Sequence, residues 1–247
     1  MIQCCFVIPI YNHHETIRAT VEQLLRFDMP ILIIDDGSDI STKYALTGLV
    51  NDYPLSVRLF NLPKNLGKGA AVMFGFHQAV TAGLTHALQI DADGQHNHDD
   101  IPTFLAAANN SPLALISGWP QYDESMPLSR KIGRQITHFW VHVETLSFKV
   151  KDTMCGFRVY PLEATLATME TKTIGRRMDF DIELMVRMYW RQTPIIFIKT
   201  PVIYPKGGRS HFRPLEDNWR ITKMHTRLFF GMLLRSPALI ARKLKRN

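Results

Sequence analysis

Two carboxylates and an amide occur within five residues, in the run Asp91-Ala92-Asp93-Gly94-Gln95. Carboxylate and amide oxygens are hard ligands of the kind that Mg²⁺ or Mn²⁺ prefers, and such an ion also binds phosphate oxygens of a substrate. Bound there, it would stabilise the negative charge that develops on a departing nucleoside diphosphate. Asp and Gly are also turn formers, so the run alone is equally compatible with a simple turn.

Two other polar clusters have the same double interpretation. In Asp35-Asp36-Gly37-Ser38, a carboxylate can accept hydrogen bonds from a base or a ribose, although Asp-Gly is also a common turn. Lys68, between Gly67 and Gly69, indicates an anion cradle at a helix N-terminus. It is not a Walker A loop, because Leu62 stands where that motif needs Gly and Gly69 where it needs Ser or Thr.

Cations and further carboxylates follow in the second half of the chain. Arg130 and Arg134 lie four residues apart at the start of a predicted helix. Cations at a helix start oppose the macrodipole, so the pair indicates a bound anion, with a solvated helix face as the alternative. Asp152 and Asp181 are candidate bases for an acceptor that must lose a proton, and surface helical acids are the plainer alternative for Asp181.

The elements that would position these residues alternate along the first 120 residues. Apolar runs predict strands at 4–10, 31–35, 56–61, 85–91 and 113–118, and apolar residues at helical spacing lie between several of them. Such alternation predicts an α/β fold with a mostly parallel sheet flanked by helices. The polar clusters follow the carboxyl ends of these strands, where ligands bind in this class.

The second half is predicted to be less regular. One helix carries an apolar face, a second spans 182–189, and a strand covers 195–199. An amphipathic helix is predicted from 217 to 236, where Pro237 would end it. The apolar face of the first helix consists of Ile132, Ile136, Phe139, Trp140 and Val143.

Composition limits the class of protein. The 247 residues, 46% hydrophobic and 21% charged, are enough for one well-buried domain and exclude disorder and a coiled coil. The apolar run at 228–234 is far shorter than the roughly 20 residues of a membrane-spanning helix. The N-terminus lacks a basic region and a cleavage site, so we expect a cytoplasmic protein. The three cysteines form neither a disulfide framework nor a zinc site.

The net charge of +7 is concentrated at one end. Residues 218–247 hold eight Lys and Arg and no acid, which leaves 1–217 close to neutral. We therefore expect 1–217 to form the catalytic domain and 218–247 a basic amphipathic helix and tail. Basic residues near an anionic leaflet contribute about 1 kcal/mol each, which predicts a peripheral membrane contact on the inner face. The alternative is an ordinary packing helix with a solvated basic face.

Taken in order, five motifs resemble the family 2 glycosyltransferases of the GT-A fold. The similarity covers roughly residues 4 to 212 and is greatest to the branch of polyprenyl-phosphate sugar transferases, such as dolichyl-phosphate mannosyltransferase. One departure is His13, where many relatives carry Glu, and another is Trp119-Pro120. The five motifs are residues 7–12, 35–38, 65–70, 91–96 and 152–158.

The resemblance implies a role for each cluster. It implies that Pro9, Tyr11 and Asp36 hold the base and ribose of the nucleotide, with Lys68 nearby. It further implies that the metal, Mg²⁺ or Mn²⁺, and the diphosphate are bound at the acidic run, and that two arginines face an acceptor phosphate. The residues at the metal and diphosphate site are Asp91, Asp93 and Gln95, and the two arginines are Arg130 and Arg134.

The resulting hypothesis is an inverting, metal-dependent transferase that moves a sugar from a nucleotide-diphosphate sugar to a polyprenyl-phosphate-like or other amphiphilic acceptor. Residues 1–120 would bind the nucleotide and 121–217 the acceptor. A hydroxyl acceptor needs a base, first Asp181 and then Asp152, whereas a phosphate acceptor is already anionic and needs only cations. A nucleotidyltransferase and a non-catalytic nucleotide-sugar-binding module remain alternatives. We expect no nucleic-acid partner, because aromatic residues are not interleaved with the basic tail.

Overall fold

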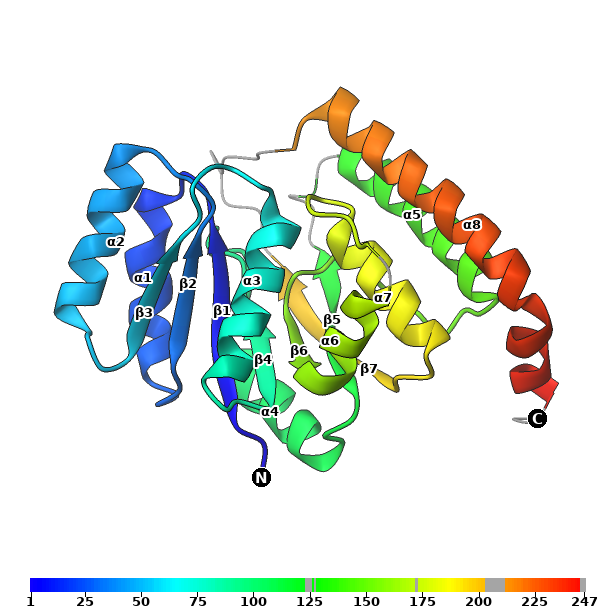
Figure 1. Cartoon of the computed structure of the whole chain (residues 1–247), viewed down its shortest axis with the longest axis horizontal. Helices are drawn as coiled ribbons and strands as arrows, with labels where there is room; N and C mark the ends of the chain where they lie inside the picture. Colours follow the sequence, from blue (N-terminus) through cyan, green and yellow to red (C-terminus); the bar gives the residue numbers. More distant parts are fainter. Residues whose placement is uncertain (123–125, 127, 172, 203–211, 245–247) are drawn as a thin grey trace.

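The computed structural model describes the chain except residues 123–125, 127, 172, 203–211 and 245–247 (Figure 1). Within the described residues seven strands form one sheet in the order β3-β2-β1-β4-β6-β5-β7. β6 runs antiparallel to both of its neighbours, and the other pairs are parallel. The strands are β1 (Cys4–Ile10), β2 (Ile31–Asp35), β3 (Val57–Asn61), β4 (His86–Gln89), β5 (Leu115–Tyr122), β6 (Arg158–Pro161) and β7 (Ile195–Val202).

Helices cover both faces of the sheet, as the α/β prediction requires. The strands β1 and β2 are buried at every position, because alternate side chains enter the two apolar clusters on either side. One cluster contains residues of α1, α2 and α4, and the other contains residues of α3, α6, α7 and α8. The helices are α1 (His14–Leu25), α2 (Ile40–Asp52), α3 (Lys68–Thr81), the 3₁₀ turn η1 (His98–Asp100), α4 (Ile101–Asn110), α5 (Leu128–Thr145), α6 (Leu162–Glu170), α7 (Phe180–Trp190) and α8 (Pro214–Leu244).

The last helix, α8, lies alongside α5 and also packs on α7 (Figure 1). Two buried carboxylates hold it in place. The carboxylate of Glu183 on α7, which is fully buried, accepts from Arg187 at 2.6 Å and from Arg227 of α8. Glu144 of α5, also fully buried, contacts Nδ1 of His225 at 2.7 Å. Because α8 also contributes core residues, it is part of the folded domain: these are Met224, Leu228, Met232 and Leu239.

The structure corrects the expected bounds of three elements and adds one helix. The helix does not end at Pro237, because α8 continues to Leu244. Proline cannot donate to the carbonyl of Leu233 one turn earlier, and the hydroxyl of Ser236 donates to that oxygen instead, at 2.8 Å. The fourth strand is shorter than 85–91 and the fifth extends beyond 118 to Tyr122. Finally, α2 was not predicted.

The apolar face expected on α5 exists, but most of it is exposed. Ile132, Ile136 and Phe139 are 53%, 56% and 60% exposed, whereas the buried residues of α5 include Thr137, Val141 and Glu144. No helix in the described part of the chain is both long and apolar enough to cross a bilayer.

Candidate active site

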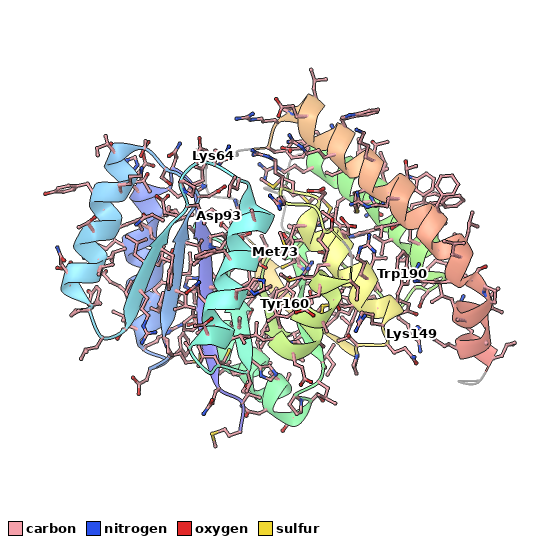
Figure 2. All side chains as sticks on the ribbon, viewed as in Figure 1. Lys64, Met73, Asp93, Lys149, Tyr160 and Trp190 are labelled. Carbon is pink, nitrogen blue, oxygen red and sulfur yellow. The ribbon has the colours of Figure 1, made fainter. Side chains whose placement is uncertain are left out.

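The polar clusters predicted at the strand ends line one cavity of about 1140 Å³. β1 contributes Pro9, the turn after β2 contributes Asp36, and the loop after β4 contributes the acidic run. Figure 2 shows Asp93 at the carboxyl end of the parallel strands, away from the N-terminus of the chain. Nine of the sequence-predicted residues line this cavity: Pro9, Tyr11, Asp36, Lys68, Asp91, Asp93, Gln95, Arg130 and Arg134.

Asp36 shapes the loop that leads into α3. Its two carboxylate oxygens accept the backbone N–H groups of Leu66 at 2.7 Å and Gly67 at 2.8 Å. Burial raises the pKa of Asp36, and these two donors only partly oppose that effect. Gly67 then adopts φ 105°, a left-handed conformation that favours glycine, and α3 begins at Lys68. The glycines beside Lys68 therefore serve the geometry of a helix start facing the cavity.

Lys68 lies between two carboxylates. Its Nζ is 2.8 Å from Oδ1 of Asp91 and 3.1 Å from Oδ2 of Asp181. Burial alone would lower the pKa of Lys68, but the charges of Asp181 and Asp91 outweigh it and raise the pKa. For Asp91, burial acts to raise the pKa, but the ammonium of Lys68 and the contact with His96 together produce a net lowering. Lys68 and Asp91 therefore stay charged at neutral pH.

Asp181 is held behind Lys68 and does not line the cavity. It is 5% exposed, and Gln89 donates to its Oδ1 at 3.3 Å. The fully buried Arg158 lies 3.8 Å from the same oxygen and donates to the backbone carbonyl of Asp181 at 2.9 Å. With both oxygens engaged by donors, Asp181 is placed to hold Lys68 and Arg158.

The antiparallel strand β6 brings the 152–158 motif beside the acidic run. A Cβ placed on Gly156 would lie 2.6 Å from Oδ2 of Asp91 and 2.8 Å from Nζ of Lys68. Because this approach leaves no room for a side chain, Gly at 156 permits the contact between Asp91 and Lys68. Gly156 and Arg158 belong to the 152–158 motif, but their position in the sequence indicates no role for either.

Asp152, the second candidate base, is 2% exposed and does not line the cavity either. Its Oδ1 accepts the backbone N–H groups of Met154 and Cys155, both at 2.8 Å. Its Oδ2 lies 3.1 Å from Nε of Arg134 and 3.2 Å from Nε2 of His138. Burial acts to raise the pKa of Asp152, but the His138 hydrogen bond and the charge of Arg134 produce a net lowering. Asp152 therefore fixes Arg134 at the cavity wall.

The acidic run fits a metal ion that is shared with a substrate. Asp93 accepts the backbone N–H of Gln95 at 3.1 Å and forms no ion pair with any described residue. Both ring nitrogens of nearby His96 are buried without a hydrogen-bond partner, and Nε2 lies 3.7 Å from Asp91. Within the described residues no three His, Cys, Asp or Glu are grouped to enclose a metal. Mg²⁺ commonly takes one or two carboxylates and completes its shell with phosphate oxygens and water.

The far wall of the cavity is apolar and comes from the two paired helices. α5 contributes Ile132, Ile136 and Trp140, and α8 contributes Ile221 and Phe229. Trp140 and Phe229 meet edge to face with ring centroids 6.2 Å apart. The arginines 130 and 134 lie on the same helix as the α5 residues. One continuous space thus passes from charged strand ends, past arginines, to an apolar wall.

Sequence reasoning missed several lining residues, among them Arg177, Asp217 and His225. Arg177 donates to Oδ1 of Asn65 at 2.9 Å and so braces the loop before Lys68. Asp217 and His225 stand on α8, whose residues from 218 onward were predicted to form a basic helix and tail outside the catalytic domain. Only the adjacent arginines 176 and 177, just before a predicted helix, offered a signal in the sequence.

Residues 5–167, more than half of the chain, match the family model described as Glycosyl transferase family 2. The chain belongs to glycosyltransferase family 2. A dolichyl-phosphate beta-glucosyltransferase of Dictyostelium discoideum is 27% identical, over 92% of this chain and 74% of its own length. The human protein of the same description is 26% identical, over 78% of this chain and 65% of its own length.

Solved structures show the same fold for this family 2 chain. A glucosyl-3-phosphoglycerate synthase from Mycobacterium tuberculosis, described in complex with Mn²⁺, UDP and phosphoglyceric acid, superposes with a TM-score of 0.68. It is 15% identical, and the match covers 94% of this chain and 78% of that one. The GT-A fold, the glycosyltransferase class and the resemblance to the polyprenyl-phosphate branch are therefore confirmed. This result favours a glycosyltransferase over the nucleotidyltransferase and binding-module alternatives.

Proposed function

We propose that this glycosyltransferase moves a sugar from a nucleotide-diphosphate sugar to a polyprenyl-phosphate acceptor, with inversion at the anomeric carbon. The main evidence is that one cavity is lined by charged residues at the strand ends, by arginines and by apolar residues of α5 and α8. The names of relatives support it. Besides the dolichyl-phosphate enzymes, a Methanococcus voltae protein named UDP-N-acetylglucosamine–dolichyl-phosphate N-acetylglucosaminyltransferase is 28% identical over 64% of this chain.

The donor would lie at the strand ends. Pro9, Tyr11 and Asp36 border the cavity where the base and ribose would bind. A divalent ion held by Asp93 and Gln95, with Asp91 beside them, would stabilise charge on the departing diphosphate. Lys68, fixed by Asp91 and Asp181, holds its positive charge at the helix start and so attracts the phosphates.

The acceptor chemistry favours a phosphate over a hydroxyl. A hydroxyl must lose a proton as it attacks, and both candidate bases, Asp181 and Asp152, are buried outside the cavity lining with their oxygens engaged. A phosphate needs no base. Arg134, oriented by Asp152, and Arg130, one turn earlier on α5, would hold the anion for in-line attack. The apolar residues of α5 and α8 would accept the first isoprene units.

We further propose that the enzyme works at the cytoplasmic face of a membrane. An aromatic series crosses from α5 to α8 through Phe139, Trp140, Phe229 and Phe230, with neighbouring ring centroids 5.6, 6.2 and 5.8 Å apart. Its two ends, Phe139 and Phe230, are 60% and 61% exposed. Exposed aromatic residues beside a basic helix are typical of interfacial contact.

The test is a transfer assay on the full chain with labelled uridine and guanosine diphosphate sugars and Mn²⁺. Three reactions are compared: polyprenyl phosphate, the polyprenol of equal length, and no lipid. We expect labelled lipid and free nucleoside diphosphate only with the phosphate. Equal product with the polyprenol would contradict a phosphate acceptor. In a separate reaction with a nucleoside triphosphate and a sugar phosphate, release of pyrophosphate would favour nucleotidyl transfer.

Arg134→Gln and Lys131→Gln form a matched pair for the same assay, because Lys131 is an exposed cation on the same helix. We expect Arg134→Gln to raise the KM for polyprenyl phosphate at least about tenfold, the loss of one charge-assisted contact. The KM for the donor should change little in both variants. An unchanged acceptor KM in Arg134→Gln would remove that residue from the acceptor site.

A further inference from the structure

A second, smaller groove of about 360 Å³ lies beside the cavity. α8 separates the two spaces: Ile221, His225 and Phe229 face the cavity, and residues about half a turn away face the groove. The other wall comes from the loop before α7, and Leu66 of the loop before α3 also takes part. We call it the basic groove, after its five cations: Arg176, Arg177, Arg220, Lys223 and Arg227.

The acids of the protein do not balance these cations. Asp179, the only carboxylate among the described residues lining the groove, is 8% exposed and accepts the backbone N–H of Arg177. Arg220 contacts Asp217 at 3.4 Å and Glu216 at 3.6 Å, and Glu216 is shared with Arg213. Arg227 contacts Glu183, but that carboxylate is shared with Arg187. Arg227 also keeps 49% of its side chain exposed. Positive charge therefore exceeds negative charge at the groove.

Two of the five cations stand out. Arg176 is exposed, and neither it nor Lys223 forms an ion pair with a described residue. Lys223 lies over the ring of Trp219, with its Nζ 5.1 Å from the ring centroid, and that ring is itself 61% exposed. Cations gathered around one concave site repel one another, so the arrangement is unfavourable unless an anion occupies it.

We propose that the basic groove binds a phosphate-bearing anion, at a site separate from the donor and acceptor positions in the cavity. Guanidinium groups match phosphate oxygens in a two-pronged geometry, and a lysine adds a mobile charge. The phosphate comes either from the headgroup of an anionic phospholipid or from a free phosphate in solution. Anion binding at the basic groove requires no sugar transfer, so its test does not depend on the proposed function.

The test compares the full chain with Arg176→Glu/Lys223→Glu and with a matched control, Lys43→Glu/Lys149→Glu. The control makes the same charge change at exposed lysines outside the groove. Figure 2 shows Lys149 near the C-terminal end of the molecule, far from Lys64 on the loop that brings Leu66 to the groove. Thermal midpoints in sodium chloride establish that all proteins are folded, and Arg176→Gln/Lys223→Gln serves if the charge reversal lowers the midpoint.

Two measurements separate the sources of phosphate. The first is flotation with phosphatidylcholine vesicles that contain or lack phosphatidylglycerol. The second is the rise in thermal midpoint in sodium phosphate, relative to sodium chloride at equal ionic strength.

We expect the groove variant to lose at least about tenfold in affinity, relative to the control variant, in one of these measurements. Loss in flotation alone identifies a lipid headgroup, and loss of the phosphate-dependent midpoint shift identifies a free phosphate. If the groove and control variants behave alike in both measurements, the proposal is overturned.

Discussion

Asp91 and Asp93 stand two residues apart, but their surroundings differ. Asp91 is in contact with Lys68, whereas Asp93 makes one backbone hydrogen bond and faces the same cavity. A cation that enters the cavity would therefore meet an uncompensated carboxylate at Asp93. The sequence does not distinguish these two predicted metal ligands, but the structure does, because Asp91 contacts Lys68 and Asp93 does not.

The first prediction concerns Asp93→Asn. With uridine or guanosine diphosphate, we expect Mn²⁺ to raise the thermal midpoint of the wild-type protein, because a bound ligand stabilises the folded state. Removing the charge of Asp93 should abolish the Mn²⁺-dependent part of that rise. Asp99→Asn is the control, since Asp99 is an exposed acid in the adjacent turn η1 and contacts Arg26. A manganese-dependent shift that persists in Asp93→Asn would exclude Asp93 from the metal site.

The second prediction concerns Asp181→Asn. The change leaves the buried Lys68 and Arg158 without a carboxylate that both contact, and breaking such buried pairs costs about 3 to 5 kcal/mol. We expect urea unfolding to show a loss of about 3 kcal/mol. Asp52→Asn, whose partner Arg18 is half exposed, should change stability little. If Asp181→Asn is as stable as the control and only kcat falls, Asp181 acts in the reaction and does not anchor Lys68.

At the scale of residues, the sequence predicts which side chains gather but not how they are connected. Strand ends place Asp36, Lys68 and Asp93 together, because the carboxyl ends of parallel strands share one edge. The burial of Asp181 and Asp152 depends on how α7 and the 152–158 turn pack, and no spacing in the sequence reports that. Arg158 illustrates the difficulty, because a fully buried arginine is rare and shows no periodic pattern.

At the scale of elements, the short turn η1 connects the acidic run to α4 and carries a buried histidine. His98 is 5% exposed and its Nδ1 lies 2.6 Å from Oε1 of Gln23 on α1. Burial, with the charges of His96 and Arg26, lowers the pKa of His98 from 6.5 to about 4. Because the unfolded chain binds this proton more readily, the contribution of His98 to stability is complete above pH 6.5 and is lost as the pH falls toward 4.

The third prediction follows from that window. Between pH 6.5 and 4 we expect His98 to account for about 3 kcal/mol of lost stability, measured by urea unfolding at several pH values. The His98→Asn variant should have a lower free energy of unfolding than the wild-type protein at pH 7. That free energy should also change less between pH 6.5 and 4. His86, whose pKa burial also lowers, contributes in the same direction in both proteins and cancels in the difference. Parallel curves for the two proteins would contradict the assignment.

Elements with a clear periodicity are predicted well, and two others show where periodicity fails. α2 was missed because its apolar and polar residues are not separated into two faces: Ile40 and Tyr44 are exposed while Thr42 is buried. α5 has the expected apolar face, but that face lines the cavity and the surface. A pattern indicates amphipathicity and does not identify what covers the apolar side.

At the scale of the whole molecule, α8 is a wall of the cavity, a wall of the basic groove and a part of the core. Deleting 218–247 to test membrane binding would therefore remove core residues such as Met224 and Leu228. Point changes on the exposed surface are the appropriate test.

The fourth prediction concerns Phe139→Ser/Phe230→Ser. Each exposed ring that moves from water into a bilayer contributes about 1.5 to 3 kcal/mol to the free energy of membrane binding. We expect these two changes to reduce flotation with anionic vesicles at least about tenfold. Leu55→Ser/Leu113→Ser is the control, because these leucines are 99% and 72% exposed and lie outside the α5–α8 pair. Equal flotation of both variants would place the membrane contact elsewhere.

The ammonium of Lys68 joins a loop at the end of the central sheet to a helix from the far half of the chain. Its contact partners thus tie the proposed leaving-group site to α7, the helix that comes before α8 in the chain. Loss of the Lys68 contacts would widen the space in which the acceptor attacks the sugar. A water molecule would then compete with the acceptor for the sugar. In Lys68→Met we expect the yield of free sugar to rise relative to glycolipid, with donor consumption as the common reference. An unchanged ratio of free sugar to glycolipid would mean that the Lys68 contacts do not control competition by water.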